Sequence, residues 1–182
     1  MEFSLIYRSK IIIAAYRGWI SPSSRVLDVG CGNAVVTEEL RRHFGCFVAG
    51  TDVLDYRKRR IPFEIMTQED KLPFKNREFD RCMFNDVLHH CSRVQELLGE
   101  ALRVADRVLV FEMEPTLMAK ISDRIVNLMH NSQINRAVNL KTLDGWKAYF
   151  EKSSLDFEYR QIRKPFLFYP FANFSFNLKN KI

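Results

Sequence analysis

A short apolar segment that ends in two closely spaced glycines constrains the fold of this chain more than any other feature. Residues 25–29, Arg-Val-Leu-Asp-Val, have the composition of a buried strand, and Gly30 and Gly32 follow directly. Residues 34–44 then carry apolar side chains at helical spacing. Glycine permits a sharp bend and a close approach of the backbone to a ligand. Free amides at the start of the helix can donate hydrogen bonds to a carboxylate or phosphate, so the pattern predicts a nucleotide-type cofactor site.

Two acidic residues stand where such a site needs hydrogen-bond acceptors. Asp28 lies at the end of the first strand, where its carboxylate can accept a hydrogen bond from a ligand amino group. Asp52 comes after a second apolar segment, residues 46–51, and a carboxylate there can accept from both hydroxyls of a ribose. These features fit NAD and S-adenosylmethionine alike. An ordinary tight turn between a strand and a helix is the remaining explanation.

Strand-like and helix-like segments alternate through most of the chain. After the second strand, the pattern predicts further strands at residues 61–66, 79–84 and 107–113. Apolar residues at helical spacing occur over residues 94–102 and again over residues 117–129. This alternation favours a parallel sheet that is covered by helices on both faces.

The two ends of the chain are predicted to complete the same domain. Over residues 1–20, apolar side chains are mixed with cations, which indicates an amphipathic N-terminal helix. Residues 143–150 predict a helix with Thr142 as its N-cap. Two strands, at residues 157–162 and 171–178, then form an antiparallel end to a mixed sheet.

Length and composition exclude several classes of protein. The 182 residues suit one domain, 1–182, and a hydrophobic content of 47% excludes a disordered chain. No apolar run approaches the roughly 18–20 residues of a membrane-spanning helix, and we find no secretory signal. The four cysteines show no metal-ligand spacing, so we expect no metal site. We interpret them as reduced thiols of a cytoplasmic protein.

The net charge of +6 is unevenly distributed. Residues 159–182 contain five cations and no acid, and residues 57–60 are Arg-Lys-Arg-Arg. Such clusters can attract nucleic acid, anionic lipid or an acidic partner, but a solvated surface is the simpler explanation. We rank nucleic acid lowest, because the sequence has no appended binding module and no base-flipping motif.

Further motifs follow the glycine turn in a characteristic order. The segments are Val-Leu-Asp-Val-Gly-Cys-Gly (26–32), Gly-Thr-Asp (50–52), Lys-Leu-Pro-Phe (71–74), Glu-Phe-Asp (78–80) and Asn-Asp-Val-Leu-His-His (85–90). With them the chain resembles the class I S-adenosylmethionine-dependent methyltransferases, in the broad small-molecule and lipid group called type 11. The resemblance covers residues 20–115 and continues more weakly at residues 140–146. It implies an α/β, Rossmann-like three-layer sandwich, whose mostly parallel seven-stranded sheet has an antiparallel C-terminal strand. An NAD-dependent oxidoreductase has no reason to carry this series.

The resemblance also implies which residues bind the methionine end of S-adenosylmethionine. Gly30, Cys31 and Gly32 would wrap around this end of the cofactor. Asp28 would lie near the amino group of the methionine. Asn85 follows the fourth strand and would lie near the methionine and the sulfonium.

A second group of residues would bind the adenosine. Asp52 would hold the ribose, and Val53 would pack against the adenine. Gln68 occupies the place of an aspartate that in this family accepts a hydrogen bond from the adenine amino group, and Glu69 would supply backbone contacts. The chain departs from the family pattern at two positions. Gln68 carries no charge, and Ala34 stands where the glycine loop of the family has its third glycine.

We therefore expect a methyltransferase that passes the sulfonium methyl of S-adenosylmethionine to a small-molecule or lipid-like acceptor by direct displacement, leaving S-adenosylhomocysteine. Such an enzyme mainly aligns the reactants and excludes water. A base is needed only if the acceptor must lose a proton, and His89 and Glu112 are the candidates.

Residues 115–155 would form a variable acceptor-side region. Some of the aromatic side chains between residues 166 and 176, with Met113, Met118 and Met129, would line an apolar acceptor cavity. Peripheral contact with a membrane is compatible with the basic C-terminal segment.

One alternative function comes from another class. The same fold can serve as a non-catalytic binding or scaffold protein, in which Ala34 and Gln68 mark weakened or lost cofactor binding. The sequence leaves the acceptor, the methylated atom and the oligomeric state open.

Overall fold

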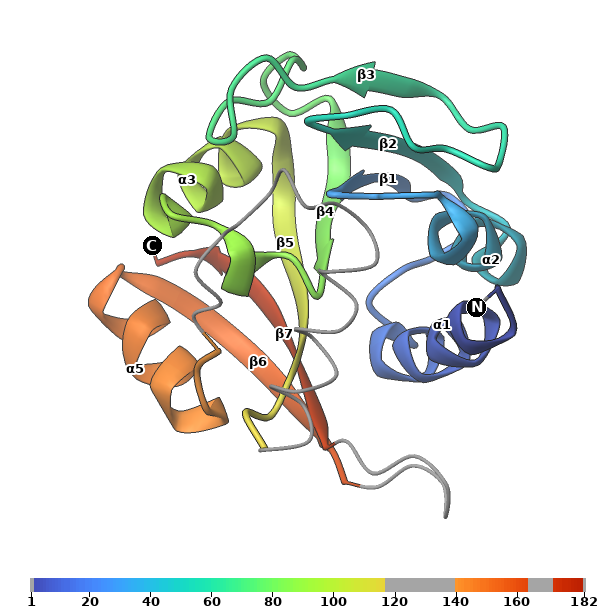
Figure 1. Cartoon of the computed structure of the whole chain (residues 1–182). Coiled ribbons are helices and arrows are strands. Elements are labelled where there is room, and N and C mark those ends of the chain that lie inside the picture. Colours follow the sequence, from blue (N-terminus) through green and yellow to red (C-terminus); the bar gives the residue numbers. More distant parts are fainter. Residues whose placement is uncertain (1, 117–139, 164–171, 182) are drawn as a thin grey trace.

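The structure is a computed structural model that describes residues 2–116, 140–163 and 172–181 (Figure 1). The strands are β1 (Arg25–Val29), β2 (Phe47–Asp52), β3 (Phe63–Ile65), β4 (Phe79–Asn85), β5 (Ala105–Met113), β6 (Leu155–Ile162) and β7 (Asn173–Asn180). The helices are α1 (Glu2–Tyr16), α2 (Val35–Phe44), α3 (Val94–Val104) and α5 (Leu143–Lys152), with a short 3-10 helix, η1 (Leu88–His90). The helix predicted over residues 117–129 lies outside the described residues.

All seven strands belong to one sheet, in the order β3-β2-β1-β4-β5-β7-β6. Strands β1 to β5 pair in parallel, whereas β7 is antiparallel to both of its neighbours, β5 and β6. This confirms the Rossmann-like fold class and the antiparallel C-terminal strand. The last strand of the chain lies inside the sheet, between β5 and β6, and β6 takes the edge.

Helices cover both faces of the sheet and make three layers. Helices α1 and α2 lie side by side on one face, and α3 and α5 lie on the other (Figure 1). The core under α1 and α2 includes Ile12, Tyr16, Leu40, Val48 and Phe111. The opposite core includes Leu97, Ala101, Trp146, Phe150 and Phe176.

The position of β7 inside the sheet explains a difference from the sequence pattern. The alternation of residues 174–178 predicts one buried face, and Phe174, Phe176 and Leu178 are indeed fully buried. Asn173 and Ser175 on the other face are also 0% exposed. A strand between two neighbours and beneath helices on both faces has no solvent side.

The connection from β2 to β3 has an unusual form. Parallel neighbours are usually joined through a helix, but residues 53–62 contain none. Instead, Ile61 packs against Cys31 and Ala34, and the Arg57 guanidinium lies 4.2 Å from the ring centre of Phe63. A Cβ atom on Gly50 would come within 2.7 Å of both the Cys31 sulfur and the Ile61 side chain. The loop of residues 53–62 therefore packs directly against β2 and the glycine turn, with no helix between them.

Local signals account for the helix ends. Thr142 caps α5, because its hydroxyl accepts a hydrogen bond from the Gly145 amide at 3.1 Å, as the sequence predicts. Gly45 ends α2 in the left-handed conformation that favours glycine, with φ of 63°. None of the described helices has the length and the apolar character to cross a bilayer.

Candidate functional site

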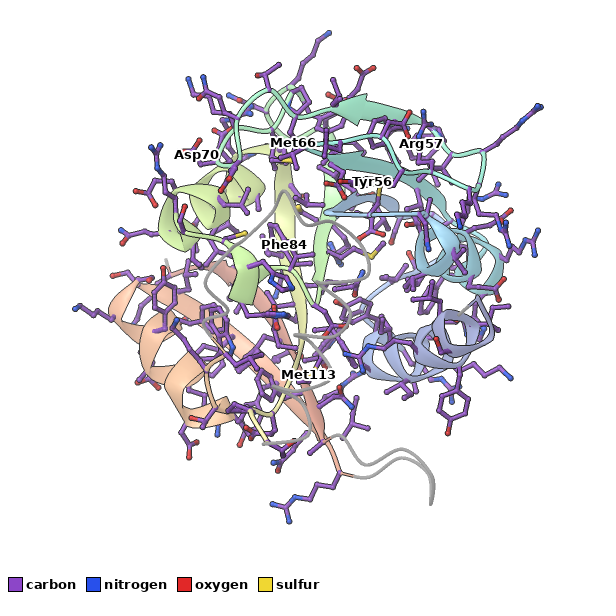
Figure 2. All side chains as sticks on the ribbon, viewed as in Figure 1. Tyr56, Arg57, Met66, Asp70, Phe84 and Met113 are labelled. Atoms are coloured by element: carbon purple, nitrogen blue, oxygen red, sulfur yellow. The ribbon has the colours of Figure 1, made fainter. Side chains whose placement is uncertain are left out.

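The candidate site lies where the carboxyl ends of β1, β2 and β4 meet. In an open parallel sheet, a crevice forms where the chain order reverses, and β1 is flanked here by β2 and β4. Figure 2 shows the side chains around this edge, with Phe84 near the middle of the molecule and Tyr56 and Arg57 on the β2 side.

The glycine turn after β1 is fastened to β2 and leaves an open side. The amides of Gly30 and Cys31 both donate to the Thr51 carbonyl, at 2.8 and 3.2 Å. Gly30 and Gly32 have φ of 73° and 54°, in the left-handed region that glycine adopts readily. A Cβ on Gly30 would lie 2.7 Å from a Val87 methyl, whereas a Cβ on Gly32 would meet nothing within 4 Å. Packing therefore requires a glycine at position 30, and position 32 faces free space.

Asp52 lies directly beside this turn. One carboxylate oxygen accepts the Gly32 amide at 2.9 Å, and the other accepts the Val53 amide at 2.7 Å. The side chain is partly exposed, and each oxygen keeps a further lone pair for a ligand hydroxyl. The two backbone donors hold the carboxylate in place before any ligand arrives.

Asp28 is buried and takes part in a hydrogen-bond network. The residue is 2% exposed. Its carboxylate accepts from the Thr37 hydroxyl at 2.6 Å and from the Asn85 amide nitrogen at 3.2 Å. Burial raises the pKa of Asp28 to about 7; the two hydrogen bonds act against this shift, and the charge of Asp52 adds to it.

Two residues of this network were missed by the sequence reasoning. The Tyr16 hydroxyl, at the end of α1, donates to the Asn85 side-chain oxygen at 2.9 Å. Thr37 offers a weak local signal, since it is a polar residue on the buried side of an amphipathic helix. Tyr16 offers none, because its partner lies 69 positions away in the chain.

Helix α1 also holds the residue that follows Asn85. The Arg8 guanidinium donates to both carboxylate oxygens of Asp86, and its second terminal nitrogen donates to the Asn173 side-chain oxygen at 3.0 Å. Asp86 has φ of 58°, a left-handed conformation that is uncommon outside glycine. An ion pair with bidentate geometry thus supports a strained residue at the end of β4.

The loop of residues 66–76, expected to carry the adenine contacts, is anchored to α3. The Glu100 carboxylate accepts from the Leu72 amide at 3.0 Å, and Arg103 donates to the carbonyls of Leu72 and Phe74. Gln68 and Glu69 are exposed on this loop. The loop reaches the site because the Met66 amide donates to the Asp52 carbonyl at 2.8 Å.

Ala34 does not face the open side of the turn. It is 0% exposed and packs against Cys31 and Ile61. Its φ of 62° lies in the left-handed region that favours glycine. The Ala34 methyl group nevertheless packs within the protein, in the cluster with Cys31 and Ile61.

His89 and Glu112 form a pair inside the protein. His89 Nδ1 lies 2.5 Å from one Glu112 oxygen, and the other oxygen accepts from the Leu88 amide at 2.9 Å. Their side chains are 0% and 1% exposed. Burial raises the pKa of Glu112, and the neighbouring His89 opposes that shift. The pair joins η1 to β5, and its catalytic assignment stays a prediction.

The chain has a recognisable family signature. A family model described as a methyltransferase domain matches residues 27–108, which span the glycine turn, Asp52 and Asn85. This match supports the resemblance of the chain to the class I S-adenosylmethionine-dependent methyltransferases. The seven-stranded order and the antiparallel β7 agree with this assignment.

Individual relatives match this chain over only part of their own length. It is 31% identical over 102 residues to the sterol 24-C-methyltransferase of Schizosaccharomyces pombe, a match that covers 50% of this chain and 27% of that protein. The chain is also 32% identical over 106 residues to an uncharacterized protein of Methanocaldococcus jannaschii, a match that covers 58% of this chain and 50% of that protein. The chain therefore matches half or less of either curated relative.

A solved structure supports the fold over nearly the whole chain. A SAM-dependent methyltransferase from Archaeoglobus fulgidus superposes with a TM-score of 0.67 at 15% identity, covering 99% of this chain and 95% of that one. At such low identity the likeness establishes a shared fold and no more.

Proposed function

We propose that this protein transfers the methyl group of S-adenosylmethionine to a small-molecule or lipid-like acceptor. The observation that carries the proposal is the arrangement at Gly32. Its amide lies 2.9 Å from the Asp52 carboxylate, and the space above its Cα is free. A backbone without a side chain beside a fixed carboxylate suits a ligand that carries a ribose.

The other residues at the site fit the two ends of this cofactor. Gly30, Cys31 and Gly32 are proposed to surround the methionine end, with Asp28 and Asn85 toward its charged amino group. A buried carboxylate with two hydrogen-bond donors suits a cation, since a positive ligand charge offsets the cost of ionising Asp28 in a buried place.

The adenosine end is proposed to lie between two loops. Val53 would pack against the adenine, and Gln68 and Glu69 would contact it from the loop anchored to α3. Gln68 can accept one hydrogen bond from an amino group, although without the charge of an aspartate.

The chemistry asks little of the protein beyond alignment. S-adenosylmethionine supplies an activated methyl carbon; the acceptor's lone pair forms the new bond as the bond to sulfur breaks. The site residues hold the cofactor and exclude water while this happens. His89 and Glu112 remain the candidate acid–base pair for an acceptor that must lose a proton, but their burial favours a structural role.

A lipid-like acceptor is the finer part of the proposal. The relative from Schizosaccharomyces pombe is named for a sterol substrate. Residues 115–155 are proposed as the acceptor-side region. Residues 117–139 of this region lie outside the described part of the chain, as do most of the C-terminal aromatics.

We also propose one domain over residues 1–182 and a cytoplasmic location. The four free thiols favour that location.

Calorimetric titration with S-adenosylmethionine, S-adenosylhomocysteine and NAD tests the proposal. We expect binding of the first two and none of NAD. Asp52→Ala should weaken binding about tenfold or more, because the ribose hydroxyls lose their acceptor. Gly32→Ala should abolish binding, because its methyl group occupies the ligand space.

A matched control separates ligand contact from backbone strain. Gly45 has φ of 63° and nothing within 4 Å of an added Cβ, so Gly45→Ala carries the same strain at the far end of α2. We expect this variant to bind normally. Failure of the wild-type protein to bind any of the three ligands would favour the non-catalytic alternative.

A further inference from the structure

We infer that Tyr16 is a positioning residue that holds the Asn85 amide against Asp28 at the methionine end of the site. The inference rests on the proposed function and deepens it, because it assigns the N-terminal helix a part in cofactor recognition. Three elements that are distant in sequence meet in this contact: α1, β1 and β4.

The polarity of the hydrogen bonds gives Asn85 one orientation. An ionised carboxylate can only accept, so Asp28 requires Asn85 to present its amide nitrogen, at 3.2 Å. The amide oxygen then points to Tyr16, whose hydroxyl donates to it at 2.9 Å. Asp28 thus selects the orientation of the amide, and Tyr16 keeps the side chain from swinging away.

Asp28 depends on the Asn85 amide because, among the described residues, its carboxylate accepts from just one other donor, the Thr37 hydroxyl. Each of these bonds favours the ionised form of the carboxylate. A ligand ammonium group needs that ionised form, so loss of the Asn85 contact should weaken recognition of the amino-acid end.

Tyr16 is itself held rigidly. The residue is 0% exposed. Its ring packs edge-on against Phe111 at 6.5 Å and beside Trp19 at 6.3 Å. Arg8, two turns earlier on α1, binds Asp86, which directly follows Asn85. Helix α1 therefore contacts two consecutive residues at the end of β4.

The decisive variant is Tyr16→Phe, which keeps the packed ring and removes only the hydroxyl. We expect the dissociation constant of S-adenosylhomocysteine to rise about fivefold to tenfold, the scale of one hydrogen bond. The affinity for 5′-methylthioadenosine, which has the adenosine and the sulfur but no amino-acid end, should stay within twofold. A hydroxyl with a purely structural role would change both affinities equally or neither, and either result overturns the inference.

A second measurement tests whether Tyr16 acts through Asn85. In an Asn85→Ala background, Tyr16→Phe should cause no further loss of S-adenosylhomocysteine affinity. A further loss of the same size would show that Tyr16 acts independently and would also overturn the inference.

The matched control is Ser9→Ala. Ser9 lies on the same helix and is 1% exposed, and its hydroxyl donates to the Ile6 carbonyl at 2.6 Å. This variant should bind both ligands as the wild-type protein does. Wild-type protein that binds neither ligand would refute the proposed function and with it the role of Tyr16, whereas normal wild-type binding with unchanged Tyr16→Phe refutes the role of Tyr16 alone.

Discussion

At the scale of single residues, the buried carboxylate of Asp28 is the most unusual feature of the protein. An acid that is 2% exposed ionises with difficulty, and its pKa of about 7 reflects that burial. The folded protein therefore holds a proton on Asp28 more tightly than the unfolded chain does. The linked stability is fully present below the unfolded pKa, and it is lost as the pH rises through the range up to about 7.

We predict that Asp28→Asn removes this pH dependence. Between pH 4 and 7 the free energy of unfolding of the variant, relative to wild type, should rise with pH by up to about 4 kcal/mol. Urea unfolding of both proteins across this pH range measures the difference. Asp144→Asn is the control, since the Asp144 side chain is 92% exposed. A constant difference between variant and wild type would contradict the prediction.

At the scale of elements, the site depends on how loops are attached to the strands and helices beside them. The glycine turn is attached to β2, the turn after β4 to α1 and β5, and the loop of residues 66–76 to α3. Besides the backbone hydrogen bonds of the glycine turn, each attachment includes a charged side chain that meets backbone groups or another charge. Such contacts are directional, and they fix loops that have little apolar surface to bury.

We predict that Arg103→Lys loosens the loop of residues 66–76. The guanidinium donates to the carbonyls of Leu72 and Phe74 and to the side chains of Asn76 and Glu100, a set that a single ammonium cannot reach. Urea unfolding should show a loss of about 1–2 kcal/mol, and calorimetry should show weaker S-adenosylhomocysteine binding. Arg41→Lys, at a surface ion pair, is the control and should change neither. Full ligand affinity in Arg103→Lys would show that the loop does not contact the cofactor.

At the scale of the whole molecule, α1 links the site to the far edge of the sheet. Beyond its C-terminal end, Trp19 donates to Glu158 on β6, and the Arg160 guanidinium stacks on the Trp19 ring at 4.0 Å. Arg160 also donates to the carbonyls of Ala15 and Arg17 at 2.7 Å. These contacts join the first helix to the last strands. We therefore expect ligand binding at the end of β4 to raise the free energy of unfolding of the whole domain.

We predict that S-adenosylhomocysteine at one hundred times its dissociation constant raises the free energy of unfolding by about 2.7 kcal/mol. For a chain of this size the midpoint of thermal unfolding should rise by roughly 5–10 °C. Scanning calorimetry with and without the ligand measures this shift. NAD at the same concentration should give none, and an equal shift with NAD would contradict the assignment of the cofactor.

Whether a feature could be predicted from the sequence depends on how far apart in the chain the interacting residues lie. Periodicity predicted the strands around residues 25–29 and 79–84 and the helix capped by Thr142, because these depend on neighbours within a few positions. The turn at Gly30 and Gly32 could also be predicted, since left-handed backbone favours glycine wherever it occurs.

By itself, the sequence determined the order of strands and helices, the glycine turn and the resemblance to a methyltransferase domain over residues 27–108. Tertiary structure alone decided that β7 lies inside the sheet, that Asp28 is buried, and that Tyr16 and Arg8 reach the end of β4. The physical reason is that propensity and periodicity act between residues close in the chain. Burial and hydrogen bonding across the sheet depend on which distant segments pack together.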